Sequence, residues 1–449
     1  MQDPKELQDP KEFDGAGNAA VSVESETELD SETEDVTFVK VLVARDGLPD
    51  VIVTDHQLHE AIGRIQSGTG PIAFDAERAS GFKYRQRAYL IQVRREGSGT
   101  FLIDPTAFDN LDELQEAIVD CDWIVHAASQ DLVCLAEVGL RPTRMLFDTE
   151  LAARLLGLPR VGLGTLVESY LGISLAKEHS ASDWSKRPFP DSWLHYAALD
   201  VDYLLDLWCL IENDLREANK WDIALQEFTH VKNTTAVIVR QDPWRRVSGL
   251  HKVTSVSDLA VVRALWHARD ELAAKQDIAP GRLLADSAIV SIALSKEHEA
   301  PKISELPELR HRNARRHSDL WVRTTVSARK ISKDQLPEAK IRGQGIPAPK
   351  NWPMRNPLAW ARLEFVRSEL TQISQKLQIP VENLMTPDAV RKVVWEAPTQ
   401  DAHVIEILNG TAARPWQCDI VAPVLSRAFA ITSVPETTAV RDESESIAQ

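Results

Sequence analysis

From residue 36 onward, short apolar runs alternate with segments whose apolar residues recur every three or four positions. The runs predict strands at 38–43, 72–77, 88–93, 100–103 and 123–125, and the helical spacing predicts helices at 55–65, 111–119 and 130–138. Strands that alternate with helices indicate a sheet layered by helices. The pattern therefore predicts a mixed α/β domain, a class whose active sites lie at strand-to-helix turns.

Two acidic residues stand at the end of the apolar run Ile72–Phe74. Asp75 and Glu77 are two positions apart, and because strand side chains alternate between faces, both carboxylates leave the same face. Two like charges this close are unfavourable unless a cation lies between them, and Mg²⁺ prefers such carboxylate oxygens. The pair also fits an ordinary exposed strand end, so it indicates a metal site only if the chain supplies further carboxylates.

Further acids follow in the same domain. Asp131 comes after the run Trp123–Val125 and a series of small residues, at a predicted helix start where the helix dipole favours a carboxylate. Tyr196 and Asp200 are four apart on a long helix predicted from 191 to 208, so they share one face. Each motif alone also fits a helix-start acid or a surface aspartate. Together the motifs match a two-metal phosphodiesterase site, in which a hydroxyl such as Tyr196 is suited to orienting the attacking water.

These motifs, in this order, resemble those of the DEDD superfamily of 3′-to-5′ exonucleases. More narrowly, they resemble those of the ribonuclease D family in the tyrosine branch. The resemblance covers about residues 37–235. The matching motifs are Phe74–Glu77 continued by Arg87–Gln92, then His126–Leu132, then Tyr196–Asp200, with matching spacers at 146–149, 162–167 and 182–188.

The resemblance implies a ribonuclease-H-like sheet with flanking helices and a role for each acid. Asp75, Glu77 and Asp200 would bind the metal ions directly. Asp131 would complete the second-metal site, and Tyr196 would hold the nucleophilic water.

His195 leaves the branch of the superfamily open. It precedes Asp200 by five residues, which also fits the histidine branch, where a histidine acts as general base near neutral pH. On a continuous helix, five residues turn about 140° away whereas four leave only about 40°. We therefore expect Tyr196 to face the metal ions.

Two similar helical segments occur in the C-terminal half, one around Leu265–Leu272 and one around Leu363–Leu370. They resemble HRDC domains, which are nucleic-acid-binding auxiliaries. The predicted organisation is a disordered acidic tail at 1–36, the exonuclease domain at 37–235, a first HRDC domain at 244–326, a basic linker at 327–355, a second HRDC-like domain at 356–433 and an acidic tail at 434–449.

The net charge of −16 is distributed unevenly. Residues 1–36 carry twelve acids against two lysines, whereas residues 310–355 carry twelve Lys/Arg against three acids. Such a basic stretch can be a solvated face, but in a chain with acidic tails it favours contact with a phosphate backbone. The candidate nucleic-acid-binding residues are Lys83, Arg85 and Arg87 near the catalytic strand, and Arg312, Arg315 and Arg316.

No run of about 18 apolar residues occurs, and the four cysteines form no CxxC pair. The sequence predicts a cytoplasmic, monomeric exoribonuclease that uses two divalent ions, Mg²⁺ or Mn²⁺. It would release 5′ nucleoside monophosphates from the 3′ ends of tRNA precursors or other structured RNAs. Two alternatives stay open: the same chemistry on DNA, and a non-catalytic RNA-binding scaffold. The presence of all four acids and Tyr196 argues against the scaffold.

Overall fold

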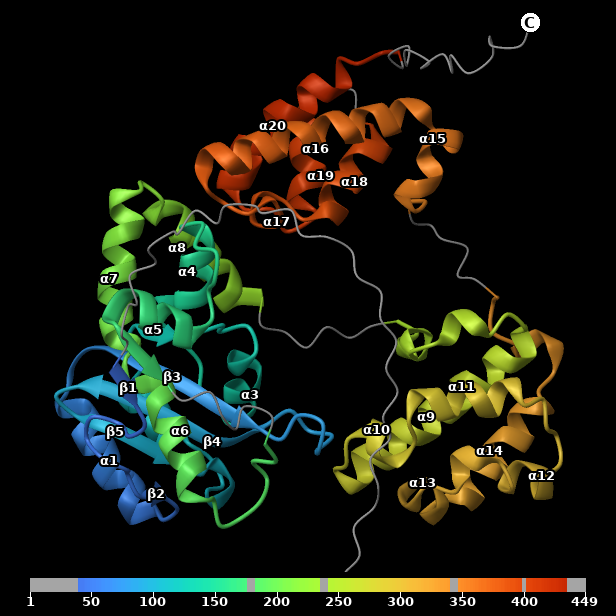
Figure 1. The fold of residues 1–449 in the computed structure, drawn as a ribbon, viewed down its shortest axis with the longest axis horizontal. Helices are drawn as coiled ribbons and strands as arrows, with labels where there is room; N and C mark the ends of the chain where they lie inside the picture. The colour runs from blue at the N-terminus through green and yellow to red at the C-terminus, as the bar shows by residue number, and fades with distance from the viewer. Residues whose placement is uncertain (1–38, 176–181, 235–240, 340–345, 398–400, 434–449) are drawn as a thin grey trace, which may run out of the picture. The chain divides into compact units, whose positions relative to one another are not determined.

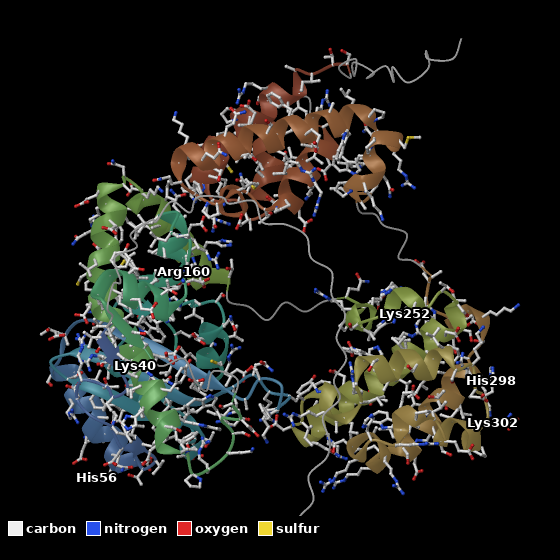
Figure 2. All side chains as sticks on the ribbon, in the orientation of Figure 1. Lys40, His56, Arg160, Lys252, His298 and Lys302 are labelled. Carbon is white, nitrogen blue, oxygen red and sulfur yellow. The ribbon has the colours of Figure 1, made fainter. Side chains whose placement is uncertain are left out.

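The computed structural model describes residues 39–175, 182–234, 241–339, 346–397 and 401–433 (Figure 1). The tails predicted at 1–36 and 434–449 lie outside these residues. A mixed α/β part comes first, and two all-helical parts follow, each with a buried apolar core. Charged side chains lie on the surface, for example those of Lys40 and Lys302 (Figure 2). Within the described ranges, no helix combines the length and the apolar character needed to cross a membrane.

A six-stranded mixed sheet forms the centre of the first part. The strands β3, β4 and β5 form an antiparallel meander, while β2 pairs in parallel with β5, and β6 and β7 continue in parallel beside β3. A separate two-stranded sheet pairs β1 with β8. The strands are β1 (Val39–Val41), β2 (Val51–Ile52), β3 (Thr69–Arg78), β4 (Ala88–Glu96), β5 (Gly99–Ile103), β6 (Trp123–Val125), β7 (Leu146–Asp148) and β8 (Ile173–Leu175), and the large sheet has the order β2-β5-β4-β3-β6-β7.

Helices cover both faces of the large sheet, which confirms the predicted architecture. The first face carries α1 (Asp55–Ser67), α2 (Asp112–Ala117) and α3 (Asp131–Glu137), and the other carries α4 (Thr149–Leu155), α5 (Leu163–Leu171), α6 (Asp191–Asp202), α7 (Leu204–Glu217) and α8 (Trp221–Thr234). Because strand side chains alternate, neighbouring residues enter different cores. Phe74 and Ile91 pack with α1–α3, whereas Ala73 and Leu90 pack on the face that α6 covers.

The prediction of one long helix over 191–208 was wrong. Helix α6 ends at Asp202 and α7 begins at Leu204, with Tyr203 at φ −111° and ψ 1° between them. Val201 and Leu204 are both fully buried, so the apolar spacing continues across the break and hides it. The carboxylate of Asp202 at the end of α6 accepts the backbone N–H of Arg45 at 2.9 Å and pairs with Arg94 at 3.1 Å.

The two helical parts share one succession of elements. Helices α9 and α16 each have 21 residues and each end at a left-handed residue, Asp277 and Gln378. A four-residue helix follows in both cases. The first part contains α9 (Val256–Gln276), α10 (Pro280–Leu283), α11 (Asp286–Leu294), α12 (Ala300–Ser304), α13 (Arg312–Arg316) and α14 (Ser318–Arg329). The second contains α15 (Trp352–Arg355), α16 (Pro357–Leu377), α17 (Val381–Leu384), α18 (Pro387–Glu396), α19 (Asp401–Asn409) and α20 (Pro415–Phe429).

Candidate active site

Helix α6 lies across the sheet (Figure 1). Three carboxylates from β3 and α6 meet there. Strand β3 supplies Asp75 and Glu77, and α6 supplies Asp200. One carboxylate oxygen from each residue lies within 4.8 Å of the other two. Glu77 is only 7 % exposed, and Asp75 and Asp200 are half-buried. Carboxylate oxygens at this spacing suit a hard divalent cation.

The sheet itself explains why the cluster forms there. Strand β6 pairs with β3 only as far as Val125, which lies opposite Phe74. Beyond Phe74, β3 continues alongside β4 alone. The chain that leaves β6 turns and enters α3 at Asp131, so this carboxylate approaches the open side of β3. Asp131 is 8 % exposed.

Asp148, at the end of β7, holds the turn that leads to Asp131. Its carboxylate accepts the backbone N–H of Ala127 at 3.1 Å and that of Ala128 at 2.9 Å. The same carboxylate caps α4 by accepting the N–H groups of Glu150 and Leu151. Ala127 has φ 58°, an unfavourable left-handed conformation for a residue with a side chain. The hydrogen bonds to Asp148 stabilise this conformation.

Sequence reasoning did not assign Asp148 a structural role. An aspartate between a strand and a helix is an ordinary helix-cap signal, which predicts only the contacts to α4. The contacts to Ala127 and Ala128 depend on the pairing of β6 with β7. Thr149 adds a related contact, because its hydroxyl lies 2.9 Å from Nδ1 of His126. Burial lowers the pKa of His126 to about 4, so its imidazole is neutral near pH 7.

Tyr196 and Asp200 lie one turn apart on α6, and the phenol O–H donates a hydrogen bond to the carboxylate. Burial, and then the charges of Asp200 and Glu77, raise the pKa of Tyr196 far above its usual range. The phenol therefore stays protonated and can donate. In the part of the chain that the structure describes, Nδ1 of His195 is buried without a hydrogen-bond partner.

The carboxylates of the cluster repel one another when they are ionised. Burial raises the pKa of Asp75 to about 6. Burial first, and repulsion from neighbouring carboxylates second, raise the pKa values of Glu77, Asp131 and Asp200 well above their usual range. Arg78 partly offsets this effect at Asp75, Glu77 and Asp131. A site that resists ionisation unless a cation enters is what a divalent metal site requires.

The basic residues singled out by the sequence lie in two places. Lys83 and Arg85 are on the connection from β3 to β4, and Arg87 directly precedes β4. Arg312, Arg315 and Arg316 are exposed on α13, around the buried Ala314. Their contact with nucleic acid stays a prediction.

Comparison with known proteins agrees with this geometry. Residues 49–216 match the family model of a 3′-5′ exonuclease, and residues 258–325 match that of an HRDC domain. A curated ribonuclease D from Shewanella sp. (strain ANA-3) is 25 % identical over 361 residues, which is 79 % of this chain and 88 % of that protein. The chain is homologous to ribonuclease D. The predicted enzyme class, a 3′-5′ exoribonuclease, is thereby confirmed, and the exonuclease superfamily uses divalent metal ions.

Two solved structures share the fold. A protein from Bifidobacterium adolescentis is 35 % identical with a TM-score of 0.80, over 88 % of this chain and all of that chain. The structure of Escherichia coli RNase D, described as an exoribonuclease involved in structured RNA processing, is 22 % identical with a TM-score of 0.65, over 85 % of this chain and 98 % of that chain. At this identity the second match shows the fold alone.

The comparisons do not confirm a tandem of HRDC domains. One HRDC match is found, at residues 258–325. Residues 345–429 match instead the model of a 3′ to 5′ exonuclease C-terminal domain.

Proposed function

We propose that the chain removes nucleotides from the 3′ end of RNA at the cluster of Asp75, Glu77 and Asp200, with two Mg²⁺ or Mn²⁺ ions. The products would be 5′ nucleoside monophosphates. The observation that supports this most strongly is the approach of three carboxylates, one buried and two half-buried, to within 4.8 Å, with pKa values raised by loss of solvation and mutual repulsion.

Each residue has a distinct task in this proposal. Asp75, Glu77 and Asp200 hold the metal ions, and Asp131 completes the second-metal site. Ions held by these carboxylates would supply activation of a water and stabilisation of the departing 3′ oxygen. The phenol of Tyr196, kept protonated, orients the attacking water by hydrogen bonding. The turn fixed by Asp148 keeps Asp131 beside β3.

The substrates we propose are tRNA precursors and other structured RNAs, processed by a cytoplasmic monomer. Lys83, Arg85 and Arg87 would contact the 3′ end near the cluster, and the arginines of α13 would contact the RNA backbone. The homology to ribonuclease D and the HRDC match support an RNA partner. Exposed arginines that are not buried in ion pairs suit a phosphate backbone.

We also propose the domain bounds given by the sequence, with the exonuclease domain at 37–235 and helical domains at 244–326 and 356–433. A basic linker at 327–355 would join the helical domains, and its two ends lie in α14 and α15. The second helical domain would be HRDC-like. This assignment is supported by a succession that both parts share: a 21-residue helix, a left-handed residue and a four-residue helix.

The test uses RNA and DNA strands of one sequence, labelled at the 5′ end, with Mg²⁺, Mn²⁺ or EDTA. We expect stepwise shortening of RNA from the 3′ end, which EDTA abolishes and Asp75→Asn abolishes without loss of RNA binding. A strand with a blocked 3′ end should resist. Faster shortening of DNA would make the chain a DNA exonuclease. Binding of RNA without shortening would make it a scaffold.

A further inference from the structure

Among the residues that the structure describes, one buried polar side chain beside the carboxylate cluster has no hydrogen-bond partner. Gln92 lies in the middle of β4 and is 0 % exposed. Among the described residues, neither its amide nitrogen Nε2 nor its amide oxygen Oε1 has a hydrogen-bond partner. A buried amide left in this state costs roughly 1–3 kcal/mol, so such groups are rare and call for an explanation.

The strand register places Gln92 at the cluster. In the antiparallel pairing of β3 with β4, Gln92 lies directly opposite Asp75, and Leu90 lies opposite Glu77. Directly opposed residues point to the same face with Cβ atoms about 4.5–5.5 Å apart. Gln92 therefore shares the face of Asp75 and Glu77, on which α6 packs with Asp200.

The other residues of this face show that Gln92 is the exception. Leu90 is fully buried in the apolar core, and so is Leu102, the partner of Gln92 on β5. Arg94, two positions along β4, is satisfied by Asp46, Thr100 and Asp202. An apolar side chain would match the neighbours of Gln92 and remove the cost of its amide. Sites that break such a rule are commonly functional.

We propose that Gln92 is a positioning residue of the metal site, which rests on the function proposed above. With the metal ions bound, its Nε2 amide group donates a hydrogen bond to the carboxylate of Asp75, directly or through one ordered water. The bond holds that carboxylate in its metal-binding orientation. Partners that orient metal-ligating carboxylates in this way change metal affinity by about 10- to 100-fold when they are removed.

A role of Gln92 in the fold and a role in metal binding predict opposite effects on stability and metal affinity when the amide is removed. Gln92→Met keeps the length of the side chain and removes the amide. If Gln92 serves the metal, the variant in EDTA should unfold at the same temperature as the wild type or higher, because an unsatisfied buried group is gone. Its Mn²⁺ dissociation constant, measured by calorimetry on the full chain without RNA, should rise about 10- to 100-fold. Excess Mn²⁺ should then restore the rate of RNA hydrolysis.

Leu90→Met is the matched control, because it changes a neighbouring side chain on the same face, opposite Glu77. Its Mn²⁺ affinity should stay within about twofold of the wild type. Gln92→Leu provides a second removal of the amide. The inference is overturned if both Gln92 variants bind Mn²⁺ like the wild type. It is also overturned if both fail to fold, since the amide would then serve the fold.

The same calorimetry separates this inference from the proposed function. If the wild type binds no Mn²⁺, or binds it as Asp75→Asn does, the metal site itself is wrong. If the wild type and Gln92→Met bind Mn²⁺ equally well and Asp75→Asn does not, only the role of Gln92 is wrong.

Discussion

Asp148 at the end of β7 accepts the backbone N–H of Ala127 at 3.1 Å and thereby fixes the turn between β6 and α3. The turn sets the position of Asp131, the first residue of α3. This hydrogen bond connects the end of β7 to the chain that leaves the neighbouring strand β6. It thereby affects the position of Asp131 relative to the carboxylate cluster. A residue that binds no metal in our account thus has a direct effect on the site.

Replacing Asp148 should therefore damage both stability and activity. Asp148→Ala leaves the half-buried N–H of Ala127 and the buried N–H of Ala128 without their acceptor, at a cost of about 1–3 kcal/mol for each group that water cannot reach. We expect a lower unfolding temperature and a lower rate of RNA hydrolysis, measured by calorimetry and by nucleotide release. Asp222→Ala, at an exposed position on α8, should change neither. Wild-type activity in Asp148→Ala would refute the role of the turn.

Tyr196 and His195 can be separated by matched variants. Tyr196→Phe removes the O–H that donates to Asp200, and we expect the turnover number to fall about 100-fold, within the usual range for a group that assists proton transfer. His195→Ala should have a much smaller effect on turnover. The measurement is the release rate of the terminal nucleotide at saturating RNA. The reverse order of effects would assign the enzyme to the histidine branch.

Stability without metal should depend on pH through the cluster. The pKa of Asp75 is raised to about 6, and those of Glu77, Asp131 and Asp200 are raised too. The folded cluster therefore holds protons that the unfolded chain releases, so its contribution is fully present below about pH 4 and is lost as the pH rises through about 6. In EDTA, we expect this loss of unfolding free energy to be smaller in Asp75→Asn than in the wild type.

Binding of a metal ion should restore the unfolding free energy that is lost as the pH rises. The ionised carboxylates bind the cation, so Mn²⁺ added above pH 7 stabilises the folded chain. At a concentration 100 times the dissociation constant, the gain is about 2.7 kcal/mol. Thermal unfolding over a series of Mn²⁺ concentrations measures this gain, and Asp75→Asn should lose most of it. Equal stabilisation of both proteins would place the bound ion elsewhere.

The arginines of α13 should contribute to RNA binding through charge. Changing Arg312, Arg315 and Arg316 to Gln should weaken RNA binding at low salt. For single-stranded RNA, it should also reduce the slope of log affinity against log salt by about 0.7 per lost phosphate contact. A control that changes the exposed Lys275, Lys296 and Lys302 to Gln removes the same charge from the same helical part. An equal loss in the control would indicate attraction by net charge alone.

Two parts of the cluster could be foreseen because they depend on local periods, whereas the approach of Asp200 to Asp75 and Glu77 was expected only from the resemblance of the motifs to an exonuclease family. Asp75 and Glu77 share a strand face through alternation, and Tyr196 and Asp200 share a helix face through the spacing of four. Both relations follow from the strand and the helix themselves and do not depend on the tertiary structure. The roles of these residues as metal ligands stay a prediction of the account.

Features that depend on pairing between distant segments could not be foreseen. Gln92 acquires its place opposite Asp75 only through the register of β3 with β4. Asp148 reaches Ala127 only because β6 and β7 are neighbours. The break at Tyr203 was missed for another reason: buried residues continue on both sides of it, so the apolar pattern does not record it.

In the proposed function, the cluster around Asp75 hydrolyses RNA with bound metal ions. The most direct measurement follows release of the 3′-terminal nucleotide in single turnovers as Mn²⁺ is titrated, with wild type and Asp75→Asn compared side by side. We expect release of a 5′ monophosphate that rises more steeply than the first power of Mn²⁺ concentration, and a loss of about 1,000-fold or more in Asp75→Asn. Release in the absence of metal, or at equal rates in both proteins, would show that hydrolysis does not depend on metal ions held by Asp75.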